Sequence, residues 1–332
     1  MSDVPKPPRG PRRPARDALI TVLVTVLLLV LFEGPAVRSA GEEMQPGWER
    51  DVVLAVGKPV GRLAEVFPFH KLDPFGWIAA DDGPAGGQGF DDGPAPEREQ
   101  GGVPPVSPDS FDPVALGAKA RPPRPLRTLL VTGDSMAMPL DLHVARKLAG
   151  NGVRVLRDPH IGTGISKSAF VDWGKLSSQQ VAKDKPDAIV VFIGANEGFN
   201  LKNARGREVK CCGPEWAALY SFRVRRMMNT YRQRGAARVY WLTLPLPRDD
   251  LRQEVARAVN AAIDVGSVPY RSSARVLDME PIFTPGGRYR DAMTVDGRKK
   301  IVRESDGIHL NDTGAEIAAQ SVLRAVQQDF TK

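Results

Sequence analysis

Residues 128–135 read T-L-L-V-T-G-D-S, a short apolar run that ends in a turn and a serine. An apolar run of this length bounded by a turn is typical of a buried strand, and the pattern over residues 138–149 that follows is helical. Residues 187–193, D-A-I-V-V-F-I, carry no polar side chain after the first position. Because buried strands without polar alternation are typical of parallel sheets covered on both faces, these two runs predict such a sheet.

Further runs of both kinds alternate along the rest of the chain. We expect strands at 153–156, 238–244 and 274–278, and helices at 214–234, 249–264 and 313–328, the last capped by Asn311 or Asp312. Strands that alternate with helices predict a three-layer α/β/α sandwich around a parallel sheet. In such sheets, sites form at the carboxyl ends of the strands.

Four short blocks carry candidate functional residues: Ser135 in G-D-S-M, Gly162 or Gly164 in I-G-T-G-I-S, Asn196 in G-A-N-E, and Asp306 with His309 in D-G-I-H. The first three blocks follow predicted strands, so we expect them on one rim of the sheet, and the fourth must reach that rim. A serine hydroxyl is a poor nucleophile until a base takes its proton, and the base needs a third group to orient it. Among the four histidines, only His309 has an aspartate three residues before it. The sequence therefore predicts Ser135, His309 and Asp306 as nucleophile, base and orienting acid.

The four blocks resemble those of the SGNH (GDSL) hydrolase superfamily, which is named for a serine, a glycine, an asparagine and a histidine. The resemblance covers about residues 126–328 and has two departures. Met136 stands where leucine is usual, and Glu197 stands where the family has aspartate. The resemblance implies a flavodoxin-like sandwich and a serine esterase that needs no cofactor and no metal.

The same resemblance implies roles for individual residues. Ser135 would attack an ester carbonyl, with His309 as base and then acid, and Asp306 would hold the imidazole. The oxyanion hole would consist of the backbone N–H groups of Ser135 and Gly164 and the side-chain amide of Asn196. Looser similarity to an uncharacterised bacterial branch of membrane-anchored SGNH proteins rests on four further segments: F-V-D-W (170–173), E-W-A-A-L-Y (215–220), V-Y-W-L-T-L-P (239–245) and V-R-E-S-D-G-I-H-L (302–310).

Other hydrolase patterns fit less well. Residues 133–137 approach the G-x-S-x-G elbow of α/β-hydrolases, but the serine follows the first strand of its domain, which leaves no room for the earlier strands of that fold. An S-x-x-K pair is absent because Met138 occupies the lysine position. No phosphate-binding loop, dinucleotide fingerprint or zinc motif is present, and we expect no nucleic-acid partner.

Residues around the blocks have their own interpretations. We interpret Asp134 as a turn or cap partner and Glu197 as a solvated loop carboxylate. Arg303 could meet an anionic substrate group or form a structural ion pair. We expect the tryptophans at 173, 216 and 241 in the core or at its rim.

The N-terminal part of the chain predicts a membrane-anchored protein. Residues 1–17 are basic, and residues 18–37 form an apolar run with only Glu33 charged. We interpret this run as a retained signal anchor, although cleavage after Ser39 is conceivable. The positive-inside rule then leaves the basic tail in the cytoplasm and the rest outside a bacterial inner membrane. A juxtamembrane segment at 38–80, a disordered Pro/Gly-rich linker at 81–125 and the catalytic domain at 126–332 follow.

Charge and cysteine content refine the functional hypothesis. Residues 121–332 hold 34 lysines and arginines against 22 aspartates and glutamates, a net charge of +12. A basic domain outside a membrane suits an anionic polymer or lipid surface. Cys211 and Cys212 are the only cysteines, and we assign them no function. The leading hypothesis is an envelope O-acetylesterase or O-acyltransferase acting on an acylated polysaccharide. The alternative is a non-catalytic, membrane-anchored component that binds glycan or a biosynthetic partner.

Overall fold

The computed structural model describes residues 89–90, 106–119, 122–168 and 170–331. The chain divides into two units, Met1–Asp81 and Asp82–Lys332, and every described residue belongs to the second. None of the helices in that described part is long and apolar enough to cross a membrane. The predicted basic tail, signal anchor and juxtamembrane segment lie outside the described residues.

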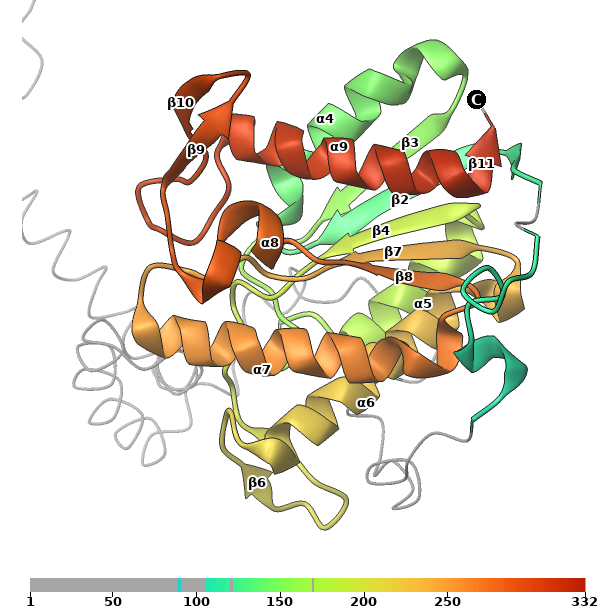
Figure 1. Cartoon of the computed structure of the whole chain (residues 1–332). Coiled ribbons are helices and arrows are strands. Elements are labelled where there is room, and N and C mark those ends of the chain that lie inside the picture. The colour runs from blue at the N-terminus through green and yellow to red at the C-terminus, as the bar shows by residue number, and fades with distance from the viewer. Residues whose placement is uncertain (1–88, 91–105, 120–121, 169, 332) are drawn as a thin grey trace, which may run out of the picture. The chain divides into compact units, whose positions relative to one another are not determined.

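The centre of the second unit is a five-stranded sheet in the order β3-β2-β4-β7-β8, with every neighbouring pair parallel (Figure 1). Its strands are β2 (Thr128–Gly133), β3 (Arg154–Pro159), β4 (Ala188–Phe192), β7 (Arg238–Leu242) and β8 (Ala274–Leu277). The middle strand β4 is buried at every residue, as its unbroken apolar run predicts. The parallel sheet inferred from the sequence is therefore confirmed.

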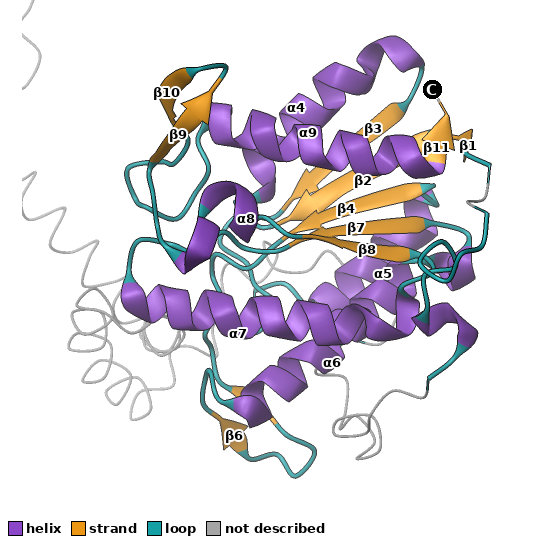
Figure 2. Cartoon of the chain, viewed as in Figure 1, coloured by secondary structure: helices purple, strands orange, loops and turns teal. Residues whose placement is uncertain are grey.

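Helices cover both faces of this sheet (Figure 2). One face is covered by α4 (Ala137–Leu148) and α9 (Asp312–Asp329), and the other by α5 (Trp173–Asp184), α6 (Pro214–Tyr231) and α7 (Asp250–Ser267). Asn311, one of the two predicted capping residues, caps α9 by accepting a hydrogen bond from the backbone N–H of Gly314 at 3.0 Å. The predicted three-layer sandwich is thus observed.

Several smaller elements were not predicted. Helix α5 begins at Trp173 and is capped by Asp172, whose carboxylate accepts hydrogen bonds from two N–H groups of the first turn. A hairpin follows the short helix α8 (Glu280–Phe283) and leads directly into the D-G-I-H loop. The remaining strands are β1 (Arg124–Pro125), β5 (Leu201–Lys202), β6 (Glu208–Val209), the hairpin strands β9 (Ala292–Val295) and β10 (Arg298–Ile301), and β11 (Phe330–Thr331).

The described parts of the predicted linker at 81–125 pack against this domain. Phe90 is buried, and its N–H donates to the Asp172 carboxylate at 2.6 Å. Asp109 forms an ion pair with Arg232 at 3.0 Å, and β1 pairs with β11 at the C-terminus. These segments therefore belong to the folded domain although their composition is that of a tether.

The core lies between the sheet and its two helix layers. Trp173, Trp216 and Trp241 are fully buried, which confirms the interpretation of the tryptophans as packing residues. The indole N–H of Trp216 donates to the carbonyl of Phe199 at 2.7 Å. Cys211 and Cys212, at the start of α6, are joined by a disulfide bond across a cis peptide bond.

Candidate active site

The serine lies in the turn between β2 and α4, at the carboxyl edge of the sheet. Gly133 ends β2 with φ of +141°, and a Cβ there would lie 2.0 Å from the Phe192 carbonyl oxygen of β4. Only glycine therefore allows the turn to pass so close to the neighbouring strand. This close passage places Ser135 directly beside the loop that follows β4.

Asp134 ties the serine turn to that loop from inside. Its fully buried carboxylate accepts hydrogen bonds from the N–H groups of Met136 at 2.9 Å, Gly194 at 2.9 Å and Ala195 at 2.8 Å. Burial raises the pKa of Asp134 to about 6, although these hydrogen bonds oppose the rise. The interpretation of Asp134 as a turn partner is confirmed, and its bonds reach a second block as well.

Ser135, His309 and Asp306 form a continuous hydrogen-bonded chain. The Ser135 Oγ lies 2.8 Å from His309 Nε2, and His309 Nδ1 lies 2.5 Å from Asp306 Oδ2. Because a carboxylate can only accept, Nδ1 carries the proton and Nε2 is left to accept from the serine hydroxyl. Burial alone would raise the pKa of Asp306, but the bonds from His309 and from two backbone N–H groups outweigh it and lower the pKa. Asp306 is therefore ionised at neutral pH and fixes the orientation of the ring.

The other two described histidines have aspartate partners of their own. His143 Nε2 lies 2.9 Å from Asp312 Oδ1, and His160 Nε2 lies 3.2 Å from Asp158 Oδ1. An aspartate partner therefore does not distinguish His309 from the rest. Its contact with Ser135 does.

Two arginines hold the D-G-I-H loop in place. Arg303 is 2% exposed and donates from Nη1 to the Ile308 carbonyl at 2.8 Å and from Nη2 to a neighbouring loop carbonyl at 2.9 Å. The backbone N–H of Arg248 donates to the Gly307 carbonyl at 2.9 Å, and its guanidinium donates from Nη1 to the Ser305 carbonyl at 3.2 Å. Burial lowers the pKa of Arg303 to about 10. The structural ion pair offered for Arg303 is not observed among the described residues, because its buried guanidinium donates to backbone carbonyls. A contact between Arg303 and a substrate group stays a prediction.

The glycine block lies against the asparagine block. A Cβ on Gly164 would lie 3.1 Å from Glu197 Oε1 and 3.2 Å from the Asn196 carbonyl oxygen, whereas one on Gly162 would meet nothing within 4 Å. The Asn196 side-chain amide donates to the Thr163 carbonyl at 3.2 Å. Of the two candidate glycines, Gly164 is therefore the one in contact with Asn196.

Three N–H groups of the serine, glycine and asparagine blocks are left available. Within the described part of the chain, the backbone N–H groups of Ser135 and Gly164 donate no hydrogen bond. The Asn196 amide uses one N–H on Thr163, and its second N–H has no acceptor among these same residues. These are the three donors that the SGNH resemblance implies for an oxyanion hole.

Glu197 is the largest departure from the sequence interpretation. It is fully buried rather than solvated, and it accepts hydrogen bonds from the N–H of Ile165 at 2.6 Å and from the N–H and Oγ of Ser166 at 2.8 and 2.5 Å. The loop of the glycine block belongs to no helix or strand, so its N–H groups need such a side-chain acceptor. Burial raises the pKa of Glu197, against the effect of these bonds. The only sign of this role in the sequence was that Glu197 keeps a carboxylate at the position where the family usually has aspartate.

No group of three His, Cys, Asp or Glu side chains within residues 89–90, 106–119, 122–168 and 170–331 is arranged to hold a metal ion. The arrangement that these residues do offer is a serine hydroxyl in contact with an imidazole, a carboxylate bonded to that imidazole, and three N–H donors.

The model of a family described as Protein of unknown function (DUF459) matches residues 128–325. A comparison with curated proteins finds no match.

Similar solved structures include three with low identity. The C-terminal catalytic domain of peptidoglycan O-acetyltransferase A from Streptococcus pneumoniae is 13% identical, with a TM-score of 0.35 over 61% of this chain and 94% of that one. Est24, a carbohydrate acetylesterase from Sinorhizobium meliloti, is 16% identical, with a TM-score of 0.38 over 60% and 99%. A lipolytic G-D-S-L family member from Veillonella parvula is 14% identical, with a TM-score of 0.39 over 60% and 97%. These similarities are too distant to assign an activity.

Proposed function

The chain belongs to the DUF459 family, which is of the SGNH/GDSL type, and on that premise we propose that it is a serine esterase or acyltransferase. The observation that carries the proposal is the chain of contacts from Ser135 through His309 to Asp306, at 2.8 and 2.5 Å. A hydroxyl in contact with an imidazole that is oriented by a carboxylate is the arrangement that activates a serine.

In the proposed reaction, Ser135 Oγ attacks an ester carbonyl while its proton passes to His309 Nε2. The tetrahedral intermediate collapses to an acyl-enzyme when His309 returns that proton to the leaving alcohol oxygen. A second alcohol or a water molecule then gives its proton to His309 and attacks the acyl group. His309 returns that proton to Ser135 Oγ as the bond between Oγ and the acyl carbon breaks, which restores the free serine. Asp306 stays ionised throughout and stabilises the imidazolium that forms in each half of the reaction.

The negative charge on the carbonyl oxygen needs donors that are in place before it develops. We assign this role to the backbone N–H groups of Ser135 and Gly164 and to the Asn196 amide. Losing one such donor typically costs about 2.7–4 kcal/mol of transition-state stabilisation. Asp134 and Glu197 would support these donors from the interior. Their carboxylates accept hydrogen bonds from the backbone of the turns to which the donors belong.

We propose an O-acylated carbohydrate as the substrate, in the cell envelope. The surplus of basic over acidic residues in the domain supports an anionic polymer. The basic and apolar N-terminal sequence supports a bacterial inner-membrane anchor with the domain outside the cytoplasm. Water and a sugar hydroxyl can both resolve the acyl-enzyme, so an O-acetylesterase and an O-acyltransferase share every residue named above.

The proposal is tested by hydrolysis of p-nitrophenyl acetate by the full-length chain and by Ser135→Ala. The matched control is Ser305→Ala, which removes an exposed serine hydroxyl from the loop that carries His309. We expect turnover in the native chain and in Ser305→Ala, and none above background in Ser135→Ala. Equal turnover in all three would reject Ser135 as the nucleophile.

The alternative, a non-catalytic glycan-binding component, drew support from the replacement of aspartate by Glu197. Glu197 accepts hydrogen bonds from the glycine block, so the replacement keeps a supporting carboxylate and removes nothing that the chemistry needs. Incubation of acetylated polysaccharide with the full-length chain, with and without an acyl donor, followed by mass analysis, separates the candidates. Loss of acetyl groups indicates an esterase, gain indicates a transferase, and no change favours the binding component.

A further inference from the structure

A cavity of about 570 Å³ lies at the amino ends of β7 and β8. Arg238, the first residue of β7, and Ser273, directly before β8, both line it. Ser135 follows the carboxyl end of β2 in the same parallel sheet. The cavity is therefore at the edge of the sheet opposite to the candidate active site, and no residue of that site lines it.

The lining of this cavity is strongly basic. Five lining residues are lysine or arginine, and two, Asp112 and Asp329, are acidic. With all of these groups in their ordinary ionisation states, the surplus is three positive charges. A hollow lined by one sign of charge attracts ligands of the opposite sign.

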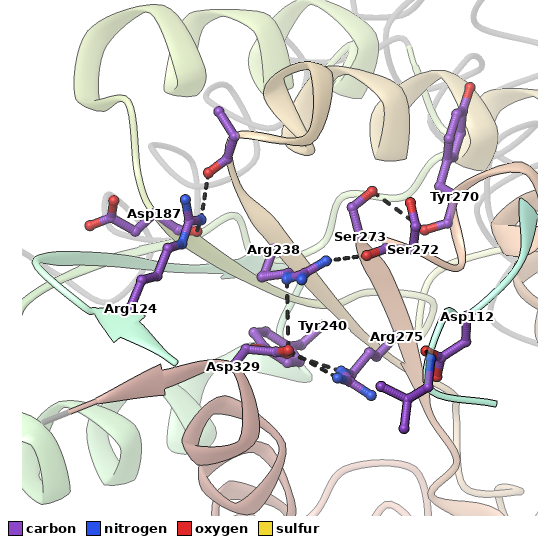
Figure 3. Close-up of polar contacts among 12 residues, drawn as sticks. Asp112, Arg124, Asp187, Arg238, Tyr240, Tyr270, Ser272, Ser273, Arg275 and Asp329 are labelled. Carbon is purple, nitrogen blue, oxygen red and sulfur yellow. Dashed lines mark hydrogen bonds and ion pairs between the residues drawn. The ribbon is translucent and has the colours of Figure 1, made fainter. Parts of the chain in front are cut away.

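Asp329 is the only lining carboxylate bound to arginine in the described residues, and two arginines share it. Arg275 donates to it from Nε at 3.0 Å and from Nη2 at 2.9 Å, and Arg238 Nε lies 3.7 Å away. Burial would raise the pKa of Asp329, but the bonds from Arg275 and Tyr240 lower it. A single negative charge therefore faces two guanidinium groups and leaves one of them uncompensated (Figure 3).

Within the described residues, the other three cations form no ion pair with a carboxylate. Arg124 donates from Nη2 to the carbonyls of Ala236 and Asp187, at 2.5 and 3.3 Å, and these neutral acceptors do not cancel its charge. Arg271 and Lys119 are exposed, and neither forms a hydrogen bond or an ion pair with any residue that the structure describes. Their donors are therefore available to a ligand in the cavity.

We propose that this cavity binds a phosphate- or carboxylate-bearing ligand about the size of one or two sugar rings. The planar guanidinium fork matches the oxygens of both kinds of anion, and the Arg238–Asp329–Arg275 network holds two such forks in fixed positions. The volume lies within the range of small-molecule sites. The proposal does not rest on the triad, so it stands or fails separately from the esterase.

The test is isothermal titration of the full-length chain with glucose 6-phosphate, with glucuronate and with glucose as the neutral control. We expect one of the two anions to bind and glucose not to bind, with weaker binding at higher salt. Arg271→Ala should weaken that binding about tenfold, the loss expected for one charge-assisted hydrogen bond. Arg146→Ala, which removes an exposed arginine from α4, should leave it unchanged, as should Ser135→Ala.

Lys119→Ala gives a second measurement because Lys119 is exposed and removing its side chain breaks no contact in the described part of the fold. Binding of the phosphate but not the carboxylate identifies a phosphorylated ligand, and the reverse identifies a uronate. The proposal is overturned if neither anion binds, or if Arg271→Ala and Lys119→Ala bind the anion as tightly as the native chain does.

Discussion

Replacing Glu197 by glutamine is the sharpest perturbation of the candidate oxyanion hole that leaves every proposed reacting group in place. Glu197 Oε2 accepts from the N–H and Oγ of Ser166, and Oε1 accepts from the N–H of Ile165. A glutamine can keep its single carbonyl oxygen at the first position. Its NH₂ group then faces the N–H of Ile165, so two donors meet and the backbone donor is left without an acceptor.

The magnitude follows from these contacts. A buried N–H left unsatisfied costs about 1–3 kcal/mol, which sets the loss of folding free energy expected for Glu197→Gln. Ile165 directly follows Gly164, so a shift of this turn moves the proposed oxyanion donor. Complete loss of one such donor lowers kcat by about 10²–10³-fold. Because the donor is displaced rather than removed, we expect kcat to fall by about 10–100-fold, with KM nearly unchanged.

The assay is steady-state hydrolysis of p-nitrophenyl acetate by the full-length native chain, Glu197→Gln and Glu304→Gln, with urea unfolding of all three. Glu304 is an exposed carboxylate in the segment that carries His309, so its replacement removes the same charge without touching the glycine block. We expect Glu304→Gln to keep native kcat and stability. Native kcat together with native stability in Glu197→Gln would refute the supporting role. A loss of stability with unchanged kcat would show that Glu197 stabilises the turn but that the turn does not position an oxyanion donor.

Three further predictions concern the other residues around Ser135. Asn196→Ala should lower kcat by about 10²–10³-fold with little change in KM; a native kcat in the same ester assay would exclude the Asn196 amide from the oxyanion hole. Asp134 has a native pKa of about 6 against an ordinary value of 3.8, so the folded state holds its proton more tightly than the unfolded state does. Its contribution to the free energy of unfolding should therefore fall by about 2 kcal/mol as the pH rises from 4 to 7. Urea unfolding should show that this fall is missing in Asp134→Asn, and parallel pH profiles of the two chains would contradict the prediction. Arg303→Met should destabilise the chain by about 1–3 kcal/mol for each carbonyl left without a donor, and it should lower kcat by misplacing His309. Thermal unfolding and ester hydrolysis measure these two effects. An active variant of native stability would mean that the loop keeps its place without the guanidinium.

The sheet was predictable because its strands are nearly unbroken apolar runs. Once β2, β3 and β4 were placed, the parallel topology required the residues after them to share an edge. That Ser135, Gly164 and Asn196 follow strands at the same edge of the sheet is a consequence of that rule alone. The position of His309 does not, because it depends on the loop held by Arg303 and Arg248.

The fate of Glu197 could not be predicted from its neighbours in the chain. Its hydrogen-bond partners are the N–H groups of Ile165 and Ser166, 32 and 31 residues earlier, and they need an acceptor only in the folded state. A local reading of G-A-N-E places the side chain in solvent, the usual location of a loop carboxylate. Burial here is a consequence of tertiary structure.

Helix α5 and the segments before residue 126 were missed for related reasons. Residues 173–184 are mostly polar, and the cap by Asp172 and packing against α6 stabilise the helix more than its own periodicity does. The Pro-rich composition of 106–125 is that of a tether, but the ion pair from Asp109 to Arg232 attaches it to the domain. Composition cannot report such long-range pairs.

The central claim is that His309 and Asp306 make Ser135 a nucleophile. Labelling the full-length chain with a fluorophosphonate, followed by peptide mass spectrometry, tests it most directly. We expect a phosphonyl adduct on Ser135 in the native chain and none in His309→Ala. The control is His160→Ala, which removes a histidine paired with Asp158 and should be labelled like the native chain. A folded native chain without an adduct on Ser135, or equal labelling in His309→Ala, would contradict the account.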